Sequence, residues 1–265
     1  MPQLAILMGL LAGVPNAPTA RLAAAGFTVV SLPPFTIVGD ESPEQVRAHA
    51  RRTVQWAASM LRQDFFEADP EPVTVWLFKN AQSYEKNARA LFGEAPSTPY
   101  GYYTAEHQAL VMNIATGGGT LVHELVHPFV RANFPRCPAW LNEGLGSLFE
   151  QSAEHEGHIR GLTNWRLAGL QDAIRAGEVP SFRALTATSS DEFYAEDRGT
   201  HYAQARYLLY FLQEQGLLVR YFREVRAASP VDPTGYETLK RVLGEKDMAG
   251  FQRRWEAYVL KLEFP

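Results

Sequence analysis

The chain has 265 residues, of which 46% are hydrophobic and 20% charged, as in folded proteins with an apolar core. Its formal net charge of −4 gives no electrostatic basis for binding nucleic acid or an anionic membrane, so we expect neither partner. Its single cysteine, Cys137, excludes an intramolecular disulfide and a zinc site made of several thiolates.

The first segment is apolar from residue 4 to residue 14, and prolines and small residues follow it. This run is too short for a membrane-spanning helix, so we expect no stable membrane insertion. It is similar to the apolar part of a secretory signal, although no Lys or Arg precedes it. We interpret residues 1–25 as a signal-like or flexible segment. Its cleavage, and export to the cell envelope rather than a cytoplasmic location, stay open.

The next part of the chain predicts a mixture of strands and helices. Residues 27–38 surround two prolines and predict two strands joined by a turn. A helix is predicted from Pro43, with Ser42 as its cap, to about residue 66. A strand, a helix and two further strands are expected at 73–78, 82–92, 100–104 and 109–114. From Thr120 onward the pattern predicts helices separated by loops, so the expected fold class is α+β.

A metal-binding pattern, H-E-x-x-H, lies at the start of this helical part. His123 and His127 stand four positions apart, on a helix for which Thr120 is the expected cap. On a helix both imidazoles project from one face and can reach one cation. Glu124 follows the first histidine directly and can take a proton from a metal-bound water and pass it to a leaving amine.

The third ligand decides what kind of metal site this is. Val130 and Asn133 occupy the positions at which H-E-x-x-H-x-x-G-x-x-H requires glycine and histidine, so that pattern is excluded. Glu143 follows His127 by sixteen positions, after a loop that contains Pro138 and can reverse the chain. Three protein ligands leave a fourth position for water, which is the arrangement of a catalytic zinc.

At these residues the chain resembles the peptidase MA-like gluzincins, whose H-E-x-x-H helix is followed by a W-L-x-E-G segment with the glutamate ligand. The matching stretches here are 118–127 and Trp140-Leu141-Asn142-Glu143-Gly144. The resemblance is strong over about 100–150 and looser from about 26 to the end. It implies a zincin-like catalytic half at 26–155, followed by a helical half at 156–265 that closes the active-site cleft.

The resemblance implies a zinc peptidase that holds one Zn²⁺ per chain through His123, His127 and Glu143. We expect a peptide or protein substrate, hydrolysed by Glu124-assisted attack of zinc-bound water. The alternative is a catalytically silent relative that uses the zinc site to bind a protein or peptide. The substrate, the choice between endo- and exopeptidase action, and the oligomeric state stay open.

Related gluzincins also supply a Tyr or His from the helical half to stabilise the tetrahedral intermediate. The resemblance implies Tyr202 for this role, with His201 as the alternative. The other histidines are expected on the surface or in loops: His49, His107, His155 and His158.

Three further expectations concern the surroundings of the motif. Pro128 removes an amide from the motif helix and is expected to kink it. Ser147 replaces an acidic residue that orients a ligand histidine in thermolysin-like relatives, and Glu150 is a candidate substitute. The strand at 110–113 is expected to expose an edge that pairs with an extended substrate.

Overall fold

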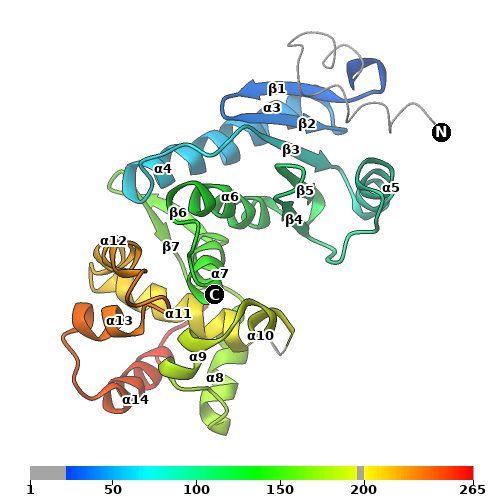
Figure 1. Cartoon of the computed structure of the whole chain (residues 1–265). Coiled ribbons are helices and arrows are strands. Elements are labelled where there is room, and N and C mark those ends of the chain that lie inside the picture. The colour runs from blue at the N-terminus through cyan, green and yellow to red at the C-terminus, as the bar shows by residue number, and fades with distance from the viewer. Residues whose placement is uncertain (1–21, 196–199, 265) are drawn as a thin grey trace. The chain divides into compact units, whose positions relative to one another are not determined.

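The structure, a computed structural model, describes residues 22–195 and 200–264 (Figure 1). Most of the signal-like segment, residues 1–21, lies outside this range. The chain divides into two compact units, residues 1–59 with 69–128 and residues 60–68 with 129–265. The later boundary falls inside helix α6 (Gly118–Asn133).

Within the described residues, the first unit contains a five-stranded mixed sheet in the order β1-β2-β3-β5-β4. Its members are β1 (Thr28–Leu32), β2 (Phe35–Gly39), β3 (Val73–Phe78), β4 (Gly101–Thr104) and β5 (Ala109–Asn113). Strands β2, β3 and β5 are parallel, whereas β1 and β4 are antiparallel to their neighbours. The strands predicted from β-branched and aromatic runs are therefore confirmed.

The prediction that the strand at 110–113 exposes an edge is wrong. Strand β5 pairs with β3 on one side and with β4 on the other, and all five of its residues are buried. The polar turn at 105–108 makes β4 and β5 antiparallel neighbours, so β4 pairs with the side of β5 that was expected to be open. The edge strand on this side of the sheet is β4, and β1 forms the opposite edge.

The helix predicted from Pro43 is present as three consecutive segments. These are α3 (Pro43–His49), the π-helical η1 (Ala50–Gln55) and α4 (Trp56–Asp64). Ser42 caps the first segment, because its hydroxyl accepts from the amide of Gln45 and the Gln45 side chain accepts from the amide of Ser42. One face of these segments is apolar and fully buried, and comprises Val46, Ala50, Val54, Ala57 and Leu61.

One apolar cluster of the first unit combines residues of the sheet and of α5 (Ala81–Phe92). Trp76 and Phe78 of β3 are almost completely buried, and the ring of Phe27 meets that of Trp76 edge to face at 5.9 Å. Each such aromatic side chain stabilises the fold by about 1.5–3 kcal/mol through burial. The short 3-10 turn η2 (Ile114–Thr116) then leads from β5 into α6.

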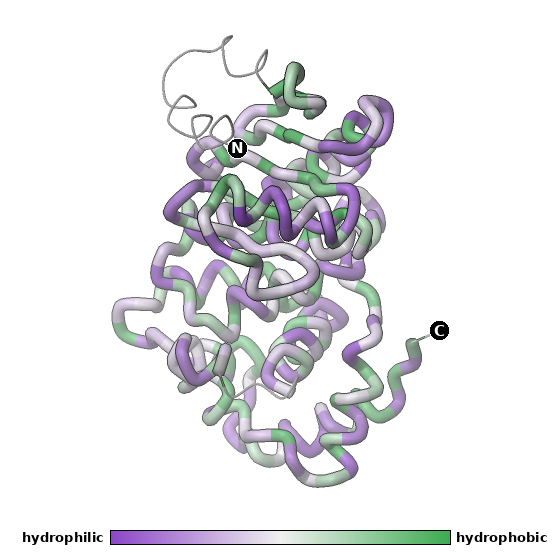
Figure 2. Tube along the Cα trace, turned by 90° about the vertical axis from the view of Figure 1, so that its right-hand side faces the viewer, coloured by the Kyte–Doolittle hydropathy of each residue, from purple (hydrophilic) through white to green (hydrophobic). Residues whose placement is uncertain are grey.

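The second unit is mostly helical, as predicted. After α7 (Ala139–Phe149) come α8 (Arg166–Ala176), α9 (Phe182–Ala187), α10 (Ser190–Ala195), α11 (Thr200–Glu214), α12 (Leu218–Ala228), α13 (Tyr236–Leu243) and α14 (Met248–Val259). Figure 2 shows hydrophilic and hydrophobic residues interspersed along the chain. No helix among the described residues is both long and apolar enough to span a membrane.

A two-stranded hairpin, β6 (Ser152–His155) with β7 (His158–Gly161), interrupts this helical part and was not predicted. Its turn consists of Glu156 and Gly157, which both have positive φ angles, as two-residue hairpin turns require. Glutamate rarely adopts that conformation, and the flanking residues are polar, so the sequence carries little strand signal here.

Candidate metal site

Helix α6 carries both histidines of the motif. It begins at Gly118, so the prediction that Thr120 caps it is wrong, and Thr120 lies inside the first turn. The chain turns sharply before the helix because Gly117 adopts a φ of 107°, which lets the helix start immediately afterwards. The helix continues through Pro128 to Asn133.

The two imidazoles lie on one face of α6. Their ring centroids are 5.1 Å apart, and His123 is buried while His127 is partly buried. Glu124 is buried beside them, with Oε2 3.8 Å from Nε2 of His127. Leu121 and Leu125 are fully buried on the rest of the helix, which fixes the direction in which the histidines point.

The acidic candidate, Glu143, projects from α7. Every residue of this helix except Asn142 is buried, including Glu143 itself. Trp140 is fully buried, and its indole Nε1 donates to the carbonyl oxygen of Thr234 at 3.0 Å. This hydrogen bond holds the first turn of α7 in place. Glu143 lies three positions after Trp140 on the same helix.

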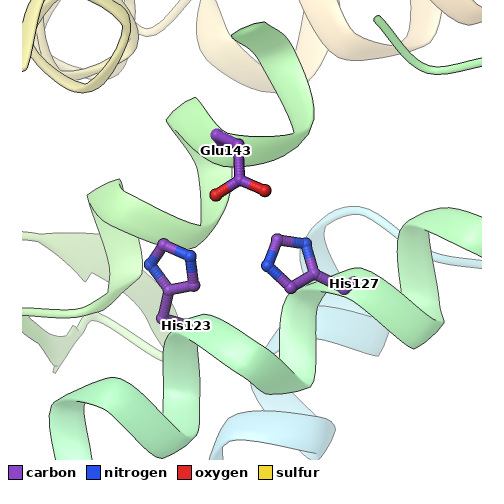
Figure 3. Close-up of side chains that lie close together, drawn as sticks. All are labelled: His123, His127 and Glu143. Atoms are coloured by element: carbon purple, nitrogen blue, oxygen red, sulfur yellow. The ribbon is translucent and has the colours of Figure 1, made fainter. Parts of the chain in front are cut away.

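The structure brings His123, His127 and Glu143 together, and Figure 3 shows the carboxylate of Glu143 pointing toward both imidazoles. One ligand atom from each residue lies within 4.8 Å of the others. Zinc binds imidazole nitrogen and carboxylate oxygen at about 2.0–2.2 Å, so adjustments of about 1 Å or less suffice to close this donor set around an ion. The three residues could therefore hold a metal ion.

A residue that the sequence analysis missed also contacts this site. The hydroxyl of Tyr194 in α10 donates to Oε1 of Glu143 at 2.6 Å. Tyr194 is 51 positions from Glu143, and no local pattern links the two residues. The sequence signal nearby is Ser189 three positions before Glu192, which is a capping pattern. This pattern predicts where α10 begins, but not that Tyr194 contacts Glu143.

The two candidates for stabilising the intermediate lie in the first turn of α11. The ring of His201 stacks on Phe193 at 5.6 Å, and the ring of Tyr202 lies 5.0 Å from the same phenylalanine. The guanidinium of Arg166 is 5.4 Å from the Tyr202 ring. Both candidates therefore pack against α10, the helix that carries Tyr194.

The residues expected around the ligands have other contacts. Ser147 is fully buried, and its carbonyl oxygen accepts from Nη1 of Arg206. Glu150 pairs with Nε of Arg166 at 3.3 Å.

Burial, together with the nearby charge of Glu143, raises the pKa of the Cys137 thiol well above its ordinary value. Cys137 is thus held as the neutral thiol, which is a poor nucleophile.

Residues 117–232 match a known protein family described as "Protein of unknown function (DUF1570)". A comparison with curated proteins found no match. The region that is similar to this family begins at the glycine before α6 and contains both histidines, Glu143 and Tyr194.

Proposed function

We propose that this chain is a zinc-dependent peptidase of the gluzincin type. The observation that carries the proposal is the approach of His123, His127 and Glu143 to within 4.8 Å, with Glu124 next to them on α6. Two imidazole nitrogens and one carboxylate oxygen form the donor set of catalytic zinc sites that keep one position open. The mixed sheet followed directly by α6 supports a zincin-like fold for the same proposal.

A zinc ion in this site would supply a Lewis acid and lower the pKa of a coordinated water. Glu124 lies beside the two histidines on α6, with Oε2 3.8 Å from Nε2 of His127, and is placed to accept a proton from a water held there. Its burial keeps bulk solvent from competing for that proton. The carboxylic acid that forms can then protonate the leaving amine of a cleaved peptide.

Metal analysis of the purified protein tests the ligand assignment. We expect one zinc per chain in the wild type, and loss of zinc in His123→Ala, His127→Ala and Glu143→Ala. The exposed His155 offers a matched control, since His155→Ala should keep the metal. Undiminished zinc in Glu143→Ala would remove that residue from the ligand set.

Casein digestion then tests the reaction. Glu124→Gln should keep zinc and lose about 2–4 decades of rate, the usual contribution of a positioned general base. Near-normal turnover in this variant would refute the mechanism. A wild type that holds zinc but cleaves neither casein nor a peptide library would instead indicate a catalytically silent binding protein.

We further propose that Tyr202 stabilises the negative charge of the tetrahedral intermediate, with His201 as the alternative. Tyr202→Phe keeps the ring and its contact with Phe193 and removes only the hydroxyl. We expect kcat to fall about 10²–10³-fold with zinc content unchanged. Full kcat in Tyr202→Phe would transfer the role to His201 or leave the metal to act alone.

A further inference from the structure

Helix α10 is held in place at both its start and its middle. At its start, the Ser189 hydroxyl accepts from the amide of Glu192, and the Glu192 carboxylate accepts from the amide and the hydroxyl of Ser189. In the middle, Phe193 is fully buried and its ring contacts those of His201 and Tyr202. These contacts fix the backbone from which the next residue, Tyr194, projects.

Tyr194 differs from the other aromatic residues of this cluster in its exposure. Tyr194 is 54% exposed, whereas Phe193 beside it is fully buried. Burial therefore contributes little to the position of Tyr194. Its hydroxyl nevertheless reaches inward and donates a hydrogen bond of 2.6 Å to a buried carboxylate. A phenol that donates to an ionised carboxylate forms a short, charge-assisted bond, about twice as strong as a neutral one.

We infer that Tyr194 is a positioning residue for the metal ligand Glu143. The inference rests on the metal site proposed above. A glutamate side chain can rotate about its bonds and present either oxygen, but the phenol hydrogen bond restricts the carboxylate to one orientation. In that orientation the carboxylate points toward the two imidazoles (Figure 3). The Glu143 side chain therefore loses little further conformational freedom when a metal binds.

This role differs from the one proposed for Tyr202. Tyr194 contacts a ligand, so the loss of its hydroxyl should weaken metal binding. The rings of Tyr194 and Tyr202 both contact Phe193, at 5.8 Å and 5.0 Å, but the role proposed for Tyr202 concerns the reacting oxygen. The two Tyr→Phe variants remove the same atom from neighbouring positions, and each serves as the matched control for the other.

The experiment measures zinc affinity by competition with a chelator in full-length wild type, Tyr194→Phe and Tyr202→Phe. We expect the Kd for zinc to rise about 10–100-fold in Tyr194→Phe, the usual effect of losing a group that orients a ligand. The Kd of Tyr202→Phe should equal that of the wild type. The absorption spectrum of the cobalt-substituted protein should change only in Tyr194→Phe, because its carboxylate ligand is no longer held in one orientation.

An unchanged Kd and cobalt spectrum in Tyr194→Phe would overturn the inference, as would an equal loss of affinity in both variants. If that happens while the wild type binds one zinc and cleaves casein, the proposed function stands and only the role of Tyr194 falls. A wild type that binds no zinc would overturn both proposals. Thermal unfolding of the metal-free variants checks that both remain folded.

Discussion

The carboxylate of Asp64 is buried at the end of α4 and accepts two hydrogen bonds from strand β7. Nδ1 of His158 lies 2.6 Å from one oxygen, and the amide of Ile159 donates to the other at 2.9 Å. The hydrogen bond to Asp64, together with the negative charge of that residue, raises the pKa of His158 above its ordinary value. The imidazolium form of His158 is therefore favoured in the folded protein.

This contact predicts a pH-dependent contribution to stability. Because the pKa of His158 is higher in the folded than in the unfolded chain, its contribution is complete below the unfolded pKa of about 6.5 and is lost as the pH rises through the folded pKa. Thermal unfolding of His158→Gln should therefore differ from the wild type more at pH 5.5 than at pH 8.5. The control variant His155→Gln, at an exposed position nearby, should show no such trend. If His158→Gln differs from the wild type equally at both pH values, the prediction is contradicted.

The sequence predicts some residues of the metal site and not others. His123, Glu124 and His127 are set by helical periodicity alone, and Glu143 follows in a short motif, so local rules suffice to propose them. Tyr194 reaches Glu143 through the packing of α10, and neither spacing nor composition reports such packing. The same applies to the contact between His158 and Asp64, which are 94 positions apart.

At the scale of elements, the helix that carries Glu143 packs closely against α11. Gly144 permits this approach: a Cβ at that position would lie 2.9 Å from a methyl of Leu209 and 3.3 Å from Cβ of Ala205. The methyl group can move, but Cβ of Ala205 is fixed to the backbone. The glycine after Glu143 is thus explained by packing between α7 and α11.

We expect Gly144→Val to lower the free energy of unfolding by about 1–3 kcal/mol, as overpacking of a core does. Because α7 must shift to admit the side chain, the Kd for zinc should also rise. Gly169→Val in α8 is a suitable control, since a Cβ at Gly169 meets nothing within 4 Å and tests helix propensity alone. Denaturant unfolding and chelator competition measure the two effects, and equal results for the two variants would contradict this account.

At this scale, the sequence predicts those elements that have a strong local signal. The long amphipathic helix from Pro43 and strand β3 have clear periods or β-branched runs, and both are present. The π-helical segment η1 keeps the same buried face as an α-helix, so no pattern marks it. The order of the strands was not predicted, because the parallel pairs β2–β3 and β3–β5 join segments that are far apart in the chain.

For the molecule as a whole, the proposed metal site links binding to folding. The donors come from two successive helices, α6 and α7, which the unfolded chain does not hold together. A ligand that binds only the folded state stabilises it by mass action, by about 2.7 kcal/mol when its free concentration is 100 times its Kd. Stability should therefore depend on zinc concentration.

We expect the Tm to rise by about 5–10 °C between chelator-treated protein and protein with zinc at 100 times its Kd, given about 2–4 °C per kcal/mol for a chain of roughly this size. The increment should shrink at acid pH, because protonated imidazoles do not bind metal. His123→Ala removes one donor and should lose the increment, whereas His155→Ala should keep it. Scanning calorimetry with and without chelator measures all three proteins. An increment that survives in His123→Ala would place the stabilising zinc elsewhere and count against the His123, His127 and Glu143 site.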